Sequence, residues 1–333
     1  MKNKKALFIA PLFFNYPHLI MEELSKQGWE VDYYDDRPSQ GAFVKGMIKI
    51  KKNLMKGLIE SYFNKILNET KDKKYDLVFI IAAKVFTSSM INELRGAQQQ
   101  ARFVLYLWDS VQNYPHIEEL ISSFDKVYSF DTEDCKTYKE LDFLPLFYSN
   151  SYEALAEEKS SHSFKYDISS ISTAHPNRYI MFRKLERYFQ GSNVKLYLYM
   201  FLASRLLFFY NKFFEEDFKP AKLKEFKFVP LSEKQVLDVV RDSKAVLDIQ
   251  HHLQSGLTMR TVECLGAKKK IITTNKNIKQ YDFYHPNNIC IIENDNFETI
   301  NEFLSTNYVE IDQDIYTKYS LPSWLKTITH ENS

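Results

Sequence analysis

Short apolar runs alternate with segments of helical hydrophobic spacing along the first half of the chain. The runs predict buried strands at 5–11, 29–34, 77–82, 103–107 and 126–130. Between the first two, apolar residues in 16–27 recur at helical spacing, and Gly28 fits the stop of that helix. Strands that alternate with helices in this way predict a parallel sheet covered by helices.

The same alternation restarts after a polar segment, 150–164, whose composition predicts a linker between domains. The second half has strand patterns at 166–171, 194–199, 226–230, 245–249, 270–274 and 289–292. Ser232 and Gln235 have the spacing of a capping box, which predicts a helix start. We therefore expect two α/β domains, residues 1–155 and 165–333, with a last helix that can pack back on the first domain.

Composition limits the classes of protein that fit. The chain has 333 residues, 44% of them apolar and 26% charged, which suits two ordinary globular domains. Its net charge of +1 gives no field that would attract nucleic acid. The three cysteines have no spacing typical of disulfides or zinc, which favours a cytoplasmic location. The densest apolar segment, 196–214, is interrupted by Arg205, Asn211 and Lys212, so no run is suited to cross a bilayer.

The segment 246–275 carries the most chemistry. A buried strand runs into a turn at Gly256, and a helix is expected from Thr258. Backbone N–H groups at a helix start, together with the helix dipole, form a site for an anion such as a diphosphate. Arg260 can add a fork of donors for phosphate oxygens, and Glu263 can accept hydroxyl hydrogen bonds from a ribose or a sugar. The alternative is an ordinary strand–turn–helix in which Arg260 and Glu263 form a surface ion pair.

The same segment resembles the donor-site region of bacterial GT-B glycosyltransferases, in particular those of capsule, lipopolysaccharide and exopolysaccharide biosynthesis. The resemblance rests on the runs 243–249, 255–263 and 270–275, and on Gly266. It implies two Rossmann-like domains facing a central cleft, with a nucleotide diphosphate sugar bound by the C-terminal domain. The N-terminal domain would receive a glycan or lipid-linked acceptor.

The resemblance implies donor-binding residues in two loops of the second half. They are Ser172, Thr173, His175 and Arg178 after its first strand, and Ser255, Gly256, Thr258, Arg260, Thr261 and Glu263 around the predicted helix start. Two positions depart from the family pattern. Ser172 stands where related chains often have glycine, and Ser255 stands where many retaining members have the first of two glutamates. Inverting and retaining transfer therefore both stay open.

Candidate residues on the acceptor side follow strands of the first half. Phe14, Asn15 and Tyr16 come after the first strand, and aromatic rings there can stack on sugar rings. An inverting transferase needs a general base near the acceptor hydroxyl, for which Asp109 is the first candidate and Asp131 the second. The cluster 35–37 is a third. Each aspartate can alternatively be a helix N-cap or a loop residue.

His251 and His252 are the only adjacent histidine pair, and adjacent residues of an extended segment point to opposite faces. They are therefore a poor pair of ligands for one metal ion. We expect no essential metal and no cofactor, with the nucleotide diphosphate sugar acting as a substrate.

Residues 45–74 form a basic segment with helical apolar spacing. It has nine lysines against three acidic residues, a local charge of +6. A basic amphipathic helix can lie on an anionic membrane surface, which would make the protein peripheral at the inner face of the plasma membrane. The alternative is a helix that packs on its own sheet with a solvated lysine face.

The expected function is transfer of a sugar from a nucleotide diphosphate sugar to a surface-polysaccharide or lipid-linked acceptor. Two alternatives remain from the sequence. One is a nucleotide-sugar epimerase on the same fold, and the other is a non-catalytic subunit that binds glycans or supports their assembly.

Overall fold

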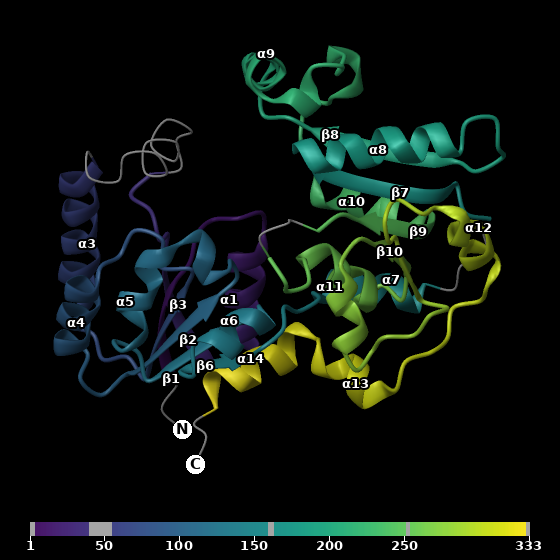
Figure 1. The fold of residues 1–333 in the computed structure, drawn as a ribbon. Helices are drawn as coiled ribbons and strands as arrows, with labels where there is room; N and C mark the ends of the chain where they lie inside the picture. Colours follow the sequence, from purple (N-terminus) through teal and green to yellow (C-terminus); the bar gives the residue numbers. More distant parts are fainter. Residues whose placement is uncertain (1–3, 40–54, 159–162, 251–253, 331–333) are drawn as a thin grey trace. The chain divides into compact units, whose positions relative to one another are not determined.

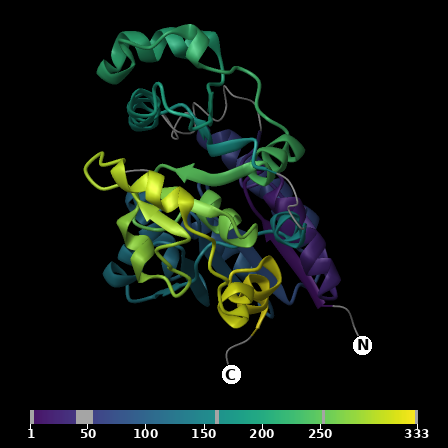
Figure 2. The same cartoon turned by 90° about the vertical axis from the view of Figure 1, so that its right-hand side faces the viewer.

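The computed structural model describes residues 4–39, 55–158, 163–250 and 254–330 (Figure 1). The chain divides into two compact units. Unit 1 contains residues 1–146, 252–256 and 321–333, and unit 2 contains 147–251 and 257–320. Figure 2 shows the same chain from the side. Each unit is an α/β structure with its own parallel sheet.

The sheet of unit 1 has six parallel strands in the order β2-β1-β3-β4-β5-β6. Their bounds are β1 Lys4–Ile9, β2 Trp29–Tyr34, β3 Leu77–Ile81, β4 Arg102–Leu107, β5 Lys126–Ser129 and β6 Leu141–Phe143. Its helices are α1 Tyr16–Lys26, α3 Lys56–Thr70, α4 Ser88–Ala97, α5 Glu118–Ile121, α6 Thr132–Thr137 and α14 Leu321–Thr329, with short 3₁₀ turns at Val111–Asn113 and Pro115–Ile117. Gly28 follows α1 with a φ of 88°, as expected for the residue that ends that helix.

Alternate strand residues of unit 1 face two different helical layers. Leu7 and Ile9 of β1 share a core with Ile59 and Phe63 of α3 and with residues of α4, which lies beside α3 (Figure 1). On the other face, the Trp324 ring of α14 meets the rings of Phe79 and Tyr106, 5.9 and 4.7 Å away between centroids. The last helix is thereby part of unit 1, to which its backbone is also tied by Arg102 Nη1, 2.9 Å from the Ile328 carbonyl.

The sheet of unit 2 has five parallel strands in the order β11-β10-β9-β7-β8. Their bounds are β7 Tyr166–Thr173, β8 Leu196–Phe201, β9 Ser243–Asp248, β10 Lys270–Thr273 and β11 Ile289–Ile291. The helices are α7 Asn150–Glu157, α8 Pro176–Tyr188, α9 Arg205–Phe214, α10 Glu233–Arg241, α11 Met259–Gly266, α12 Glu298–Ser305 and α13 Gln313–Lys318. Three 3₁₀ turns lie between these elements, at Glu216–Phe218, Leu223–Glu225 and Lys276–Gln280.

The core of unit 2 is built mainly from one sheet face and the helices α8 and α12. Phe182 and Leu185 of α8 and Ile300 and Phe303 of α12 share this core with buried residues of β7, β9 and β10. On α10, Ser232 and Gln235 form the capping box that the sequence predicts.

The two-unit parallel α/β plan confirms the predicted fold class, while two local predictions are wrong. Residues 150–157, predicted as part of a linker, form α7, which buries Tyr152 and Leu155 in unit 2. The predicted strand at 226–230 is only an isolated bridge between Lys227 and Phe201. It runs beside β8, the edge strand, and Pro230 removes a donor that a longer ladder would need.

Candidate functional site

The strand order of unit 2 reverses between β7 and β9, since β8 follows β7 on one side and β9 lies on the other. In open parallel sheets, ligands bind beyond the carboxyl ends of the strands at such a reversal. Ser170 joins the two strands near this end, because its Oγ donates to the Leu247 carbonyl at 2.8 Å. The residues that follow are Ser172 and Thr173 on β7 and Asp248 on β9.

Asp248, the last residue of β9, organises the start of α11. Its buried Oδ2 accepts hydrogen bonds from the hydroxyls of Thr258 and Thr261, both at 2.7 Å. Thr258 Oγ1 also accepts from the Thr261 N–H at 3.3 Å, so Thr258 is the N-cap and the helix begins at Met259. Both threonine hydroxyl protons point to Asp248 and are not directed at a ligand. Sequence reasoning missed this aspartate, although its place at the end of a buried strand was a usable signal.

Arg260 and Glu263 are paired, as the alternative interpretation of the sequence expected, but the pair is not on the surface. Arg260 Nη1 lies 3.0 Å from Glu263 Oε2, and the glutamate side chain is only 4% exposed. The same Nη1 donates to the hydroxyl of Tyr152 on α7 at 3.1 Å. The pair therefore holds α11 to α7. Tyr152 was missed because its segment has the polar composition of a linker.

Arg178, in the first turn of α8, has a different environment. Its Nη1 donates to the Thr173 carbonyl at a long 3.4 Å, and no carboxylate of the described residues forms an ion pair with it. Burial lowers the pKa of the Arg178 guanidinium, and the charge of Asp248 opposes that effect. A half-buried cation near the strand reversal, paired with no carboxylate in the described chain, is suited to receive an anion.

The other residues predicted in this loop line the same strand end. Thr173 is exposed, Ser172 is half-buried with its Oγ 3.3 Å from that of Ser170, and His175 is the N-cap residue of α8. Pro176 takes the first helical position, where it needs no N–H partner. The start of α8 is thus preorganised beside Arg178.

The remaining two residues of the predicted donor motif, Ser255 and Gly256, belong to unit 1. The Asp131 carboxylate accepts from the Ser255 N–H at 2.8 Å, from the Gly256 N–H at 3.2 Å and from the Ser255 hydroxyl. A side chain at Gly256 would also collide with Phe130, since a Cβ there would lie 2.7 Å from the Phe130 carbonyl oxygen. As the sequence suggested, this position needs a glycine because another group lies very close to its backbone. That group is Phe130 of the protein and not a ligand.

Asp131 has the surroundings of a structural residue. It is 2% exposed, caps α6 through the Glu133 N–H at 2.9 Å, and holds Ser255 and Gly256 as described. Its carboxylate could reach an acceptor hydroxyl only after breaking these hydrogen bonds. The N-cap alternative therefore describes Asp131 better than a role as general base.

Asp109 is more accessible, with 27% of its side chain exposed. It lies past the carboxyl end of β4 and pairs with Lys84 Nζ at 2.7 Å. Burial works against the charge of Lys84, but Asp109 and Tyr114 outweigh it, so the pKa of Lys84 is raised. Ala82 and Ala83 precede this lysine with φ of 70° and 49°, a strained turn that often marks functional sites. Sequence reasoning missed Lys84 because the residues at this bend, Ala82 and Ala83, are not types that predict a turn.

A buried carboxyl group, that of Asp36, lies past the end of β2. Asp36 is 0% exposed, and its carboxylate accepts no hydrogen bond from the described residues, although Arg37 Nε lies 3.1 Å from Oδ1. Burial raises the pKa of Asp36 to about 7, partly offset by Arg37. The cluster 35–37 thus contains a carboxyl that titrates near neutral pH.

Asp36→Asn is expected to change the pH dependence of stability. Because the pKa of Asp36 is about 7 in the folded protein and about 3.9 in an unfolded chain, the folded state alone holds this proton between those values. The wild type therefore loses stability as pH rises through that window, by roughly 3 kcal/mol between pH 5 and pH 8. The asparagine variant lacks this loss. Urea unfolding of both proteins at pH 5 and pH 8 checks it, and equal pH dependence would contradict the assignment.

The predicted acceptor-side residues form an aromatic cluster in unit 1. Phe13 contacts Phe14 at 4.5 Å, Tyr16 at 6.3 Å and Trp108 at 6.1 Å between ring centroids. Phe13 and Phe14 are 50% and 71% exposed, and Phe14 has a φ of 49°. Asn15 is the N-cap residue of α1. Exposed rings at the carboxyl end of β1 provide a surface on which a sugar ring can stack.

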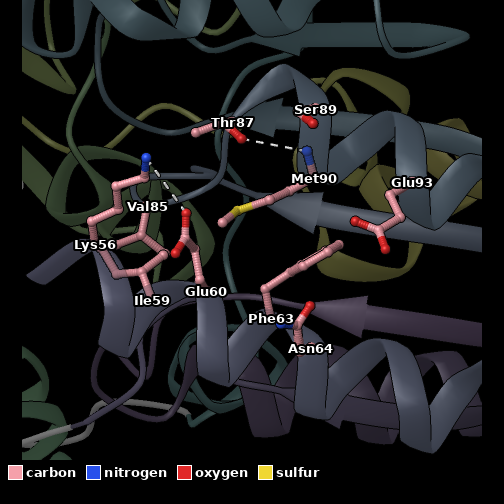
Figure 3. A pocket seen from close by; sticks show the side chains of 10 residues that line it. All are labelled: Lys56, Ile59, Glu60, Phe63, Asn64, Val85, Thr87, Ser89, Met90 and Glu93. Atoms are coloured by element: carbon pink, nitrogen blue, oxygen red, sulfur yellow. Dashed lines mark hydrogen bonds and ion pairs between the residues drawn. The ribbon is translucent and has the colours of Figure 1, made fainter.

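A cavity of about 650 Å³ lies between α3 and α4 in unit 1 (Figure 3). Lys56, Glu60 and Asn64 of α3 and Met90 and Glu93 of α4 contribute to its wall, and none of the predicted site residues does. The membrane hypothesis for 45–74 stays a prediction for 45–54, which lie outside the described residues. In the described part of this segment, α3 buries Ile59, Phe63 and Ile66 in the core of unit 1. Helix α3 therefore packs on the sheet of its own unit, as the alternative interpretation of the sequence predicted.

Metal-ligating clusters and membrane-spanning helices are both absent from the described part of the chain. Within residues 4–39, 55–158, 163–250 and 254–330, no three metal-ligating side chains come together. His251 and His252 lie outside these ranges. No helix within the same ranges has the length and apolar character needed to cross a membrane.

No protein-family model matches this chain, and no curated protein sequence matches it. Several solved structures are similar to this chain in fold. A lipopolysaccharide outer core galactosyltransferase, WaaB, is 12% identical with a TM-score of 0.51, over 97% of this chain and 98% of its own. The UDP-forming α,α-trehalose-phosphate synthase of Burkholderia vietnamiensis is 10% identical with a TM-score of 0.64, over 98% of both chains. The UDP-GlcNAc 2-epimerase of Methanocaldococcus jannaschii is 12% identical with a TM-score of 0.54, over 97% and 99%. The chain therefore has the GT-B fold over nearly its whole length.

Proposed function

We propose that this protein is a glycosyltransferase that moves a sugar from a nucleotide diphosphate sugar to a surface-glycan or lipid-linked acceptor. One observation carries the proposal. The strand reversal of unit 2 places Arg178, at a helix start and paired with no carboxylate of the described residues, next to the ends of β7 and β9. This arrangement suits a diphosphate, and it occurs in a chain whose fold is that of GT-B glycosyltransferases.

In this proposal, Arg178 and the first N–H groups of α8 bind the diphosphate, with Ser172 and Thr173 along its path. The charge that develops on the leaving diphosphate is stabilised by this guanidinium and by the helix dipole. Asp248 keeps the start of α11 in place through its two threonine partners. The Arg260–Glu263 pair acts as a positioning element, because both groups are engaged with each other.

The acceptor would stack on Phe13 and Phe14 of unit 1, with Asp109 as the general base if the reaction inverts. The acceptor oxygen then forms a bond to the anomeric carbon, the bond to the diphosphate breaks, and the hydroxyl proton passes to Asp109. Lys84 holds that carboxylate in position through their 2.7 Å contact. This assignment uses the more accessible of the two aspartates that the sequence singled out.

The donor base that we propose is uracil. The names of two structurally similar proteins, a UDP-forming synthase and a UDP-GlcNAc epimerase, both include a uridine nucleotide. The epimerase also keeps a second activity open, since an epimerase acts on the nucleotide sugar without an acceptor.

A stabilisation screen tests the proposal. UDP at about 100 times its Kd should raise the free energy of unfolding by about 2.7 kcal/mol, which thermal unfolding detects, whereas an equal concentration of UMP should act weakly because it lacks the diphosphate. UDP-sugars that stabilise are then incubated with and without glycan acceptors. UDP release that needs an acceptor supports the transferase, epimerisation by donor alone supports the alternative, and no response to any nucleotide would favour a non-catalytic subunit.

A further inference from the structure

Helix α9 of unit 2 exposes most of its apolar residues to solvent, whereas a helix that packs on a core buries them. Its five most exposed apolar residues are Leu206, Phe209, Tyr210, Phe213 and Phe214. Their spacing of i, i+3, i+4, i+7 and i+8 places them on one face. Their exposures range from 58% to 81%, so this face is turned to solvent along its whole length. Figures 1 and 2 both show α9 at the outer edge of unit 2, beyond β8.

The inward side of the same helix is the more polar one. Phe208 is its one buried residue and packs on Phe226, with ring centroids 5.3 Å apart. Lys212 is half-buried, and its Nζ donates to the carbonyls of Lys219 and Ala221, both at 2.7 Å. The helix is therefore anchored by one ring and one lysine, and its orientation is fixed by these contacts. The contacts of Phe208 and Lys212 therefore determine that the apolar face points outward.

The exposed area is large for a single chain. Five such side chains at these exposures present on the order of 600 Å², a size at which a contiguous patch marks an interaction surface. Val229, which is 72% exposed, follows Phe228, and the Phe228 ring lies 5.8 Å from the Arg205 guanidinium at the start of α9. The segment after the helix thus extends the apolar surface.

Basic residues outnumber acidic ones in α9 and the segment that follows it. Between residues 205 and 227 the chain has six basic residues, Arg205, Lys212, Lys219, Lys222, Lys224 and Lys227, against four acidic ones. Glu216 pairs with Lys219, and Glu225 lies near Arg183 and Tyr179. Lys222, Lys224 and Lys227 are exposed and form no ion pair with any described residue. Apolar side chains next to unpaired lysines match a layer that is apolar inside and anionic at its surface.

We propose that α9 docks this protein on an anionic lipid surface, with Leu206, Phe209, Tyr210, Phe213 and Phe214 inserted among the lipids and the nearby lysines at the headgroups. A second copy of the chain fits less well. A symmetric contact in which the two copies of α9 run parallel would bring their Arg205 side chains together. The aromatic composition also suits the boundary between headgroups and acyl chains.

Vesicle flotation tests the proposal with the full chain. Wild-type protein should float with vesicles that contain 30% phosphatidylglycerol in phosphatidylcholine, and far less with phosphatidylcholine alone. Phe209→Ser/Phe213→Ser should reduce the bound fraction at least tenfold. Both rings are exposed, so the variant should fold normally. Phe143→Ser, which removes an exposed ring of β6 in unit 1, is the matched control and should float like the wild type.

Wild-type protein that stays at the bottom with anionic vesicles would overturn the proposal, and so would flotation unchanged by the double substitution. A wild type that elutes as a dimer, while the double variant elutes as a monomer, would assign the face to a second copy. The proposal does not depend on glycosyl transfer. The double variant should keep the stabilisation by UDP, so a failure of the docking surface and a failure of the donor site are distinguishable.

Discussion

Arg178→Ala is expected to weaken UDP binding roughly a hundredfold. The guanidinium is half-buried at the start of α8 and pairs with no carboxylate of the described residues. Loss of hydrogen bonds from a charged donor to the diphosphate costs about 3 kcal/mol, which corresponds to that factor. The UDP concentration that gives half-maximal thermal stabilisation measures the change.

The same substitution should affect stability little, within about 1 kcal/mol, because it removes a desolvated charge without leaving a carboxylate unpaired. Arg183→Ala is the matched control on the same helix. This exposed arginine pairs with Glu186 and Glu225, away from the strand end. UDP affinity should be normal in that variant. Arg178→Lys should keep part of the affinity, since it retains the charge and loses the planar fork. Normal UDP affinity in Arg178→Ala would remove this residue from the donor site.

Arg260→Ala should reduce the free energy of unfolding by about 3 kcal/mol. The substitution leaves the Glu263 carboxylate, 4% exposed, without its cation, and it removes the contact with Tyr152. Urea unfolding measures the loss. Arg260→Ala/Glu263→Gln should recover most of it, because the neutral amide no longer needs a cation.

The double variant also separates two roles of Arg260. If the arginine only positions α11 and α7, the stable double variant should bind UDP with nearly wild-type affinity. A stable double variant that binds UDP weakly would show that the guanidinium itself contacts the donor. A single variant as stable as the wild type would mean that the buried pair contributes nothing to the fold.

Much of the fold could be predicted from the sequence because local patterns determine it. Buried strands such as Leu77–Ile81 are continuous apolar runs, and the capping box at Ser232 depends only on residues three apart. Helix α7 was missed because the burial of Tyr152 depends on α11, which is distant in sequence.

The site was predicted less completely, for a related reason. The positions of Ser172, Arg178 and Arg260 follow from the strand pattern, but their partners do not. The i, i+3 spacing allows the Arg260–Glu263 pair, but no local signal shows that the pair is buried, that Arg260 contacts Tyr152, or that Thr258 and Thr261 donate to Asp248. These contacts move the expected diphosphate ligand from Arg260 to Arg178. Likewise, helix α9 was not predicted within the apolar segment 196–214, and only the structure shows that its apolar face points outward.

The central claim is that a nucleotide diphosphate binds at the carboxyl ends of β7 and β9 in unit 2. Hydrogen–deuterium exchange of the protein with and without saturating UDP tests it most directly. We expect slower exchange in peptides that cover 172–180 and 257–264, with little change along α3 and α4. Protection confined to unit 1, or UDP binding that leaves both of these peptides unchanged, would contradict the assignment.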